Sequence, residues 1–156
     1  MRAARVAPNV VGFSAAISAC GKSGEWVHAL SLLDEMRTAG VAPDVIIFSA
    51  AISACEKCRV WERALSLLDE MRGADIAPNV VSFNAAISAC AKGQEWERAL
   101  SLLDEIRAAG IAPNKISFSA AISAYEKAGK WKRALLLLDE MRKAGIAPDV
   151  ISFSAA

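Results

Sequence analysis

Five prolines recur along the chain at a fixed interval of 35 residues. They are Pro8, Pro43, Pro78, Pro113 and Pro148. The sequence around them recurs at the same interval, and residues 45–79 match residues 80–114 at 25 of 35 positions without a gap. A unit of this size cannot close a core of its own, so its apolar face must be covered by the next copy. The spacing therefore predicts a solenoid of stacked units.

The interval divides the chain into four complete units with a partial unit at each end. The complete units are 10–44, 45–79, 80–114 and 115–149, the remnant of a preceding unit is 1–9, and a truncated fifth unit is 150–156. Four units exceed the minimum of about three that such arrays need. Met1-Arg2 aligns with Met36-Arg37 inside the first unit, and neither end carries a polar cap. We therefore expect a piece of a longer array.

Composition narrows the class of protein. With 54% hydrophobic and 22% charged residues, the chain is predicted to be globular rather than disordered. Its apolar runs are too short to cross a membrane, which predicts no membrane partner. The formal net charge of +1 gives no overall basic character, so a nucleic-acid partner would have to be held by local charge placement.

The cysteines suggest free thiols. Cys20, Cys55 and Cys90 occupy the same position in successive units. Equivalent positions on stacked helices lie roughly 8–10 Å apart, which is beyond the reach of a disulfide. Cys55 and Cys58 form a CxxC motif, but there is no second pair, and the single histidine, His28, lies one unit away. We expect buried thiols and no metal site.

Each unit contains two segments with helical character. In the second, exemplified by 26–39, apolar residues recur at helical spacing among good helix formers, which predicts an amphipathic helix. We expect this helix to end at Gly40, Gly110 and Gly145, because glycine readily adopts the left-handed cap conformation. Asp75 replaces the glycine in the second unit, which predicts a weaker helix stop there.

The first segment, exemplified by 10–22, is apolar or small over most of its circumference, which predicts a helix packed on both sides. One polar stripe remains, with residues four apart. Its members are Ser14, Ser18 and Lys22; Ser49, Ser53 and Lys57; Asn84, Ser88 and Lys92; and Ser119, Ser123 and Lys127. The stripes could line a common groove edged by lysines. They could equally form an ordinary solvated face, with each lysine favoured by the helix macrodipole.

Other recurring residues also have two interpretations. A position directly after each proline holds an N-cap residue, and capping alone would explain it. These residues are Asn9, Asp44, Asn79, Asn114 and Asp149. The tryptophans at the start of the second helix favour packing over base stacking. Acidic pairs such as Asp34-Glu35 and Asp69-Glu70 indicate a solvated outer face with local ion pairs rather than catalytic carboxylates.

The pattern as a whole resembles a known repeat family. The opening Val80-Val81-Ser82-Phe83-Asn84, the Ala-Leu-x-Leu-Leu-Asp-Glu-Met core and the closing Gly-Ile-Ala-Pro-Asn are similar to pentatricopeptide repeats of the plain 35-residue type. The resemblance covers essentially the whole chain. It implies an all-α, right-handed solenoid of antiparallel helix pairs that binds single-stranded RNA with one base per unit.

By that resemblance, the fifth and last residues of each unit bracket one base edge. The pairs are Ser14 with Asp44, Ser49 with Asn79, Asn84 with Asn114, and Ser119 with Asp149. The second residue of each unit would sandwich the base faces: Val11, Ile46, Val81 and Ile116. Lysines would approach the phosphates: Lys22, Lys57, Lys92 and Lys127.

Read with the family's code, these pairs imply the register 5′-G-A-Y-G-3′. Hydroxyl, carboxamide and carboxylate groups differ in whether they donate or accept, which is what separates one base edge from another. The resemblance also implies RNA processing or stability in a mitochondrion or chloroplast, without a cofactor or small-molecule substrate. Two alternatives stay open. One is a protein-binding helical scaffold. The other is the targeting arm of an RNA-modifying enzyme, although residues 1–156 contain no catalytic motif.

Overall fold

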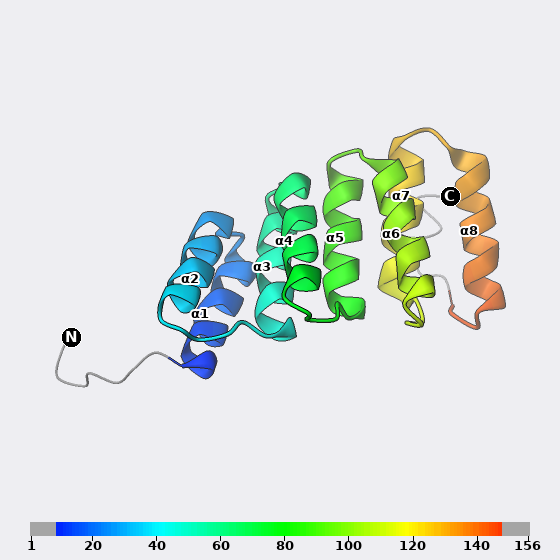
Figure 1. Ribbon diagram of the computed structural model, residues 1–156. Helices are drawn as coiled ribbons and strands as arrows, with labels where there is room; N and C mark the ends of the chain where they lie inside the picture. Colours follow the sequence, from blue (N-terminus) through cyan, green and yellow to red (C-terminus); the bar gives the residue numbers. More distant parts are fainter. Residues whose placement is uncertain (1–8, 148–156) are drawn as a thin grey trace.

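A computed structural model of the chain describes residues 9–147, which form eight α-helices and no strand (Figure 1). The helices are α1 (Val10–Ser23), α2 (Trp26–Thr38), α3 (Val45–Lys57), α4 (Trp61–Gly73), α5 (Val80–Lys92), α6 (Trp96–Ala108), α7 (Lys115–Lys127) and α8 (Trp131–Lys143). The expectations for 1–8 and 148–156, including the pairing of Asp149 with Ser119, lie outside the described residues.

The helices are arranged as four successive hairpins (Figure 1). The first helices, α1, α3, α5 and α7, pack on one another in a continuous row. Each second helix packs on its own first helix, and α2, α4 and α6 also pack on the first helix of the following pair. This arrangement confirms the predicted all-α helical-repeat solenoid, in which each unit is covered by its neighbour.

One apolar core runs through the stack. The first helices supply a buried isoleucine at the same position in every unit, and the second helices supply a buried leucine. These residues are Ile17, Ile52, Ile87 and Ile122, and Leu33, Leu68, Leu103 and Leu138. Because the first helices are contacted on both sides, α3 and α5 bury more of their circumference than α2 or α4. One side of each first helix remains exposed to solvent near its N-terminus.

The first helices begin at the predicted caps. Asn9, Asp44, Asn79 and Asn114 have extended backbones, and each side-chain oxygen accepts a hydrogen bond from the backbone N–H three residues later. These donor–acceptor distances are 2.9–3.1 Å. In α5 and α7 the third helical residue is a serine whose hydroxyl oxygen accepts a hydrogen bond from the backbone N–H of the cap residue, which completes a capping box.

The second helices end slightly before the predicted glycines. Gly40, Gly110 and Gly145 have φ of 76–78°, but each lies just beyond an alanine C-cap. In α2, the Gly40 N–H donates to the Arg37 carbonyl oxygen at 3.0 Å and the Val41 N–H to that of Met36 at 2.9 Å, the pattern of a Schellman motif. Asp75 takes the same left-handed conformation at φ 60°.

A second left-handed position recurs between the two helices of each hairpin, which sequence analysis did not anticipate. Gly24 and Gly129 have φ of 72°, and the equivalent Arg59 and Gln94 have φ of 61° and 64°. Only two of the four residues are glycine, so the composition did not reveal the turn. The backbone bonds that close it enforce the conformation whichever side chain is present.

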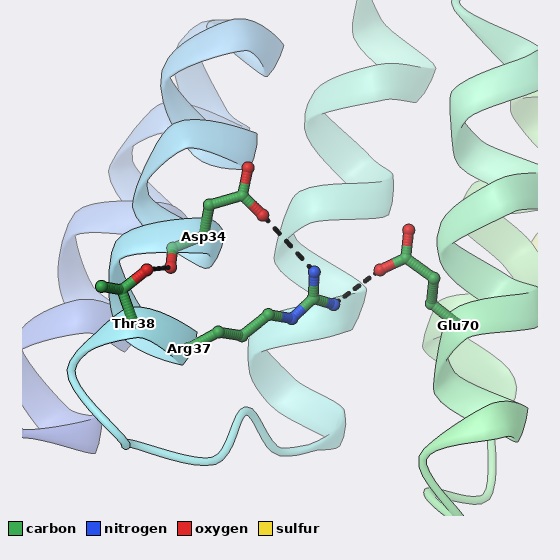
Figure 2. A network of polar contacts seen from close by, with 4 residues as sticks. All are labelled: Asp34, Arg37, Thr38 and Glu70. Atoms are coloured by element: carbon green, nitrogen blue, oxygen red, sulfur yellow. Dashed lines mark hydrogen bonds and ion pairs between the residues drawn. The ribbon is translucent and has the colours of Figure 1, made fainter.

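Successive second helices are joined by arginines (Figure 2). Arg37 of α2 lies 2.6 Å from Glu70 of α4 and 3.5 Å from Asp34 of its own helix, and its guanidinium lies over the Phe48 ring of α3. The contact recurs one and two units on, with Arg72 to Glu105 and Arg107 to Glu140. The prediction of local pairing is correct for Asp34 and Asp69, whereas Glu70 contacts the arginine of the preceding unit instead.

Candidate nucleic-acid interface

A row of exposed aliphatic side chains marks the open edge of the first helices. One stands at the second position of each first helix, where it has no apolar cover. The exposed fractions are 74% for Val11, 60% for Ile46, 54% for Val81 and 60% for Ile116. A single exposed aliphatic residue is ordinary. Four in the same register form a continuous apolar row, and such a row indicates a binding surface.

The polar stripe lies on the same helix face, because residues three, seven and eleven positions after the aliphatic residue point in similar directions. Its fifth-position members lie deeper than expected. Ser49 and Asn84 are each 5% exposed, whereas Ser14 and Ser119 are half-buried. The next unit contacts Asn84 through Ser117. The structure thus brings the predicted residues to one face, and at the inner units it also closes them in.

The predicted pairs differ from unit to unit. In the third unit, Asn84 Nδ2 donates to Asn114 Oδ1 at 3.0 Å. In the second, the Ser49 hydroxyl is buried and has no hydrogen-bond partner among the described residues. In the first, the structure contains no hydrogen bond between Ser14 and Asp44, although both are described. The direct Asn84–Asn114 contact brings together two side chains that are 30 residues apart in the sequence.

The last residue of each of the first three units caps the next helix and keeps a second side-chain atom outside the cap. Its side-chain oxygen caps the next helix, so capping is a fact of the structure for Asp44, Asn79 and Asn114. The other side-chain atom of each is not used by the cap. Asp44 therefore presents a carboxylate oxygen, while Asn79 and Asn114 present an amide nitrogen. In the third unit, the capping residue Asn114 also contacts the fifth-position residue Asn84.

Three of the four lysines are exposed. Lys22, Lys57 and Lys127 form no ion pair with another residue in the range 9–147. Lys92 differs, because its Nζ contacts the carboxylate of Glu56 on the first helix of the preceding unit. This contact neutralises one of the four charges predicted to meet phosphate.

The tryptophans are packing residues in the inner units, as predicted. The Trp61 ring lies under the Arg98 guanidinium at 5.3 Å and against Gly93, where an added Cβ would lie 2.3 Å from Cδ1. Trp96 lies 5.8 Å from the Tyr125 ring. These contacts place the tryptophans between units and away from the aliphatic row.

All four cysteines are free; the predicted burial is correct for Cys55 and Cys90 and wrong for Cys20, which is only partly buried. Burial raises the pKa of the Cys55 thiol to about 11 and that of Cys90 to about 12, while Cys58 is exposed. The CxxC thiols are therefore in different environments, and Cys58 Sγ donates to the Gly24 carbonyl oxygen at 2.7 Å. In the described part of the chain, no three histidine, cysteine or acidic side chains gather as metal ligands would. None of its helices is long and apolar enough to span a bilayer.

Comparison with known protein families identifies the repeat. A family model described as the pentacotripeptide-repeat region of PRORP matches residues 2–155. The chain belongs to the pentatricopeptide repeat family. Solved pentatricopeptide repeat structures resemble it closely, and maize PPR10 in complex with an 18-nucleotide psaJ RNA element superposes with a TM-score of 0.83 at 29% identity. That match covers 94% of this chain and 22% of PPR10, so the chain spans less than a quarter of that protein.

Two protein-only RNase P structures share the fold. The pentatricopeptide repeat domain of Arabidopsis thaliana PRORP1, crystallised with tRNA, has a TM-score of 0.79 at 21% identity, over 89% of this chain and 74% of that one. Arabidopsis thaliana PRORP2 has a TM-score of 0.78 at 20% identity, over 94% of this chain and 33% of that one. No curated protein matches the chain in sequence.

Two features of the site were not predicted from the sequence. The hydrogen bond from Ser117 to Asn84 and the contact between Lys92 and Glu56 both join different units. A repeat pattern shows which residues are equivalent, but it does not show which side chains of adjacent copies touch. Glu56 itself could have been noticed in the sequence, because only the second and fourth units carry an acidic residue directly before the stripe lysine.

Proposed function

We propose that this array binds single-stranded RNA, with one base for each unit. The observation that carries the proposal is the row of exposed aliphatic side chains, each followed three residues later on the same helix by a serine or asparagine. Bases have flat apolar faces and polar edges, which fit such alternation. PPR10, 29% identical to this chain, was crystallised with an RNA element and supports the same ligand class here.

The aliphatic row would hold the base faces. In this arrangement a base lies between the side chains of consecutive units, for example between Ile46 and Val81. Stacking on aromatic platforms contributes about 1–3 kcal/mol per base, and aliphatic side chains offer less. Four such sites give weak binding, so residues 1–156 alone are expected to bind RNA less tightly than a longer array.

The polar pairs would read the base edges. Following the family's code, Ser14 with Asp44 favours guanine, Ser49 with Asn79 favours adenine, and the Asn84–Asn114 pair favours a pyrimidine. With Ser119 and Asp149 reading a fourth base, the proposed register is 5′-G-A-Y-G-3′.

The proposal is tested with short labelled RNAs. Fluorescence anisotropy titrations should show tighter binding to an unstructured strand that contains the GACG core than to the same strand with that core scrambled. Equal affinity for the two strands would remove the proposed base reading. Binding to neither strand, with binding to a peptide library instead, would favour the alternative of a protein-binding scaffold, for which the aliphatic row also offers an apolar surface.

A substitution tests the register. Asn84→Ser converts the third pair into the combination found in the second unit, Ser49 with Asn79. The third-base preference should then move from pyrimidine to adenine, by about tenfold in relative affinity. The preferences at the other bases serve as internal controls. A third-base preference that stays with pyrimidine would show that the pair or the register is assigned wrongly.

The larger context is part of the proposal. We propose that the chain acts as a binding module without catalytic activity of its own, in the processing or stability of organellar transcripts. The absence of a known catalytic motif from residues 1–156 is consistent with this role. Full-length protein expressed with a fluorescent tag tests the location, and a nuclear or cytosolic signal would contradict it.

A further inference from the structure

The hydrogen bonds around the third reading pair lead to a further inference, which rests on the proposed function. We propose that Ser117, the third residue of the fourth unit, sets the base preference of the third unit by occupying the acceptor atom of Asn84. The proposal gives a physical cause for a preference for cytosine over uracil at the third base. Ser117 is a positioning residue, since it acts through Asn84.

The orientation of both amides follows from backbone donors. Asn114 Oδ1 accepts the backbone N–H groups of Ile116 at 3.0 Å and Ser117 at 3.1 Å, so this atom must be the oxygen. The Asn84 atom 3.0 Å away from it must then be a donor, which identifies it as Nδ2. The remaining amide atom of Asn84 is its oxygen.

The hydroxyl of Ser117 completes the network. Its oxygen accepts the Asn114 backbone N–H at 3.0 Å, which leaves its single O–H free to donate. Asn84 Oδ1 lies 2.5 Å away and Asn114 Oδ1 3.1 Å away, and the nearer atom is the better acceptor. Ser117 is fully buried, so water does not compete for this hydrogen bond.

The consequence concerns which atoms remain for RNA. Asn84 Oδ1 is occupied by Ser117, whereas the second N–H of Asn84 and the Asn114 amide nitrogen have no partner among residues 9–147. The pair thus offers donors only. Both pyrimidines carry two acceptors and one donor on this edge, but the acceptors N3 and O2 of cytosine are adjacent, whereas the N3–H of uracil lies between its acceptors O4 and O2. Two neighbouring donors therefore match N3 and O2 of cytosine and set one donor against the uracil N–H, which favours cytosine.

The second unit provides a matched control. Ser82 has the same position, the same complete burial and the same capping box, in which it accepts the Asn79 backbone N–H at 2.9 Å. Its hydroxyl donates to the Asn79 cap, and no hydrogen bond joins it to Ser49. Replacing Ser82 therefore removes the same cap without touching a reading atom.

The experiment compares two RNAs that differ only at the third base, with GACG and GAUG cores. Wild-type protein should bind GACG about tenfold more tightly. Ser117→Ala leaves Asn84 Oδ1 without a donor, and the uracil N–H can then supply one. Affinity for GAUG should rise, and the ratio between the two RNAs should fall to about twofold or less. Ser82→Ala should leave the ratio unchanged.

Further variants separate a hydroxyl effect from a packing effect. Ile47 fills the equivalent buried position in the second unit, so an apolar residue there is compatible with the fold. Ser117→Thr should restore the tenfold ratio and Ser117→Val should not, although these two side chains have nearly the same shape. Circular dichroism checks that each variant keeps its helical content.

Each outcome has a distinct meaning. An unchanged ratio in Ser117→Ala, or equal loss in Ser82→Ala, would overturn the role of Ser117. Wild-type protein that discriminates at the other bases but binds GACG and GAUG equally would overturn the donor-only assignment. Wild-type protein that discriminates at no base would instead overturn the proposed function, independently of Ser117.

Discussion

At the scale of single residues, burial raises the pKa of two cysteine thiols. Cys55 and Cys90 occupy the same position in successive units and are both buried. Desolvation disfavours the thiolate, which raises the pKa of Cys55 to about 11 and of Cys90 to about 12 from the ordinary 9.0. Cys58, three residues after Cys55, is exposed. Burial therefore makes the thiols of Cys55 and Cys90 poor nucleophiles.

The raised pKa values of these two thiols predict that stability depends on pH. Above pH 9 the thiols ionise in the unfolded chain but not in the folded one, so the free energy of unfolding should fall as the pH rises from 9 to 12. Urea unfolding of wild type and of Cys55→Ala/Cys90→Ala at pH 8, 9.5 and 10.5 measures this loss. The variant should lose less stability than wild type over the same range. Parallel losses would show that other groups cause the alkaline effect.

At the scale of single elements, the end of each second helix depends on one left-handed residue. Three units use glycine at this position, and the second uses Asp75 at φ 60°. A side chain with a Cβ is strained in this conformation by roughly 1–2 kcal/mol, although aspartate is among the more tolerant residues. The Schellman hydrogen bonds are present in α4 nonetheless, with the Ile76 N–H donating to the Met71 carbonyl oxygen at 2.9 Å.

Asp75→Gly should therefore stabilise the protein. The expected gain in free energy of unfolding is about 1 kcal/mol, because relief of strain exceeds the added freedom of the unfolded chain. Urea denaturation followed by circular dichroism measures it. The reverse change, Gly110→Asp, serves as the control and should destabilise by a similar amount. A loss of stability in Asp75→Gly would mean that the aspartate side chain makes a stabilising contact.

At the scale of the whole molecule, the outer helices are connected by a chain of ion pairs. Arg37 contacts Glu70, Arg72 contacts Glu105 and Arg107 contacts Glu140, so one contact joins each pair of successive units. Each arginine also lies over a phenylalanine of the next first helix, at 5.7–5.8 Å. The contacts are partly exposed, so each contributes little by itself and weakens in salt.

A double-mutant cycle tests this connection. Arg37→Ala, Glu70→Ala and the double variant should give a coupling energy of about 0.5 kcal/mol, which diminishes in 1 M salt because exposed charges are screened. Arg37→Ala combined with Glu105→Ala is the control, since Glu105 contacts the next arginine instead. Its coupling should be near zero. Equal coupling in both cycles would indicate a general charge effect.

The contact between Lys92 and Glu56 acts across units on the proposed RNA face. Glu56→Gln should free Lys92 for phosphate, so RNA affinity should rise and the salt dependence should steepen by about 0.7 per added contact. Glu126→Gln is the matched control, because Glu126 occupies the same position in the fourth unit and no ion pair joins it to another described residue. Anisotropy titrations at several salt concentrations measure both. The same gain in the two variants would assign the effect to net charge.

Much of the architecture was predictable from the sequence because the repeat carries its own internal evidence. Equivalent residues recur at one interval, so helix periodicity, caps and free cysteines could each be inferred several times over. The polar stripe of the proposed RNA face was predictable for the same reason, whereas the role of the aliphatic residues came from the family resemblance. The left-handed turns at Arg59 and Gln94 were not, because backbone hydrogen bonds rather than residue type impose that conformation.

The sequence by itself determined the period, the hairpin unit and the face on which each equivalent residue lies, since these depend on local spacing along the chain. Only the tertiary structure decided which side chains meet across units: Arg37 with Glu70, Lys92 with Glu56, and Ser117 with Asn84. These partners are 33–36 residues apart. Their contact depends on how far each hairpin is shifted and turned against the next, and that geometry is set by packing of the whole core.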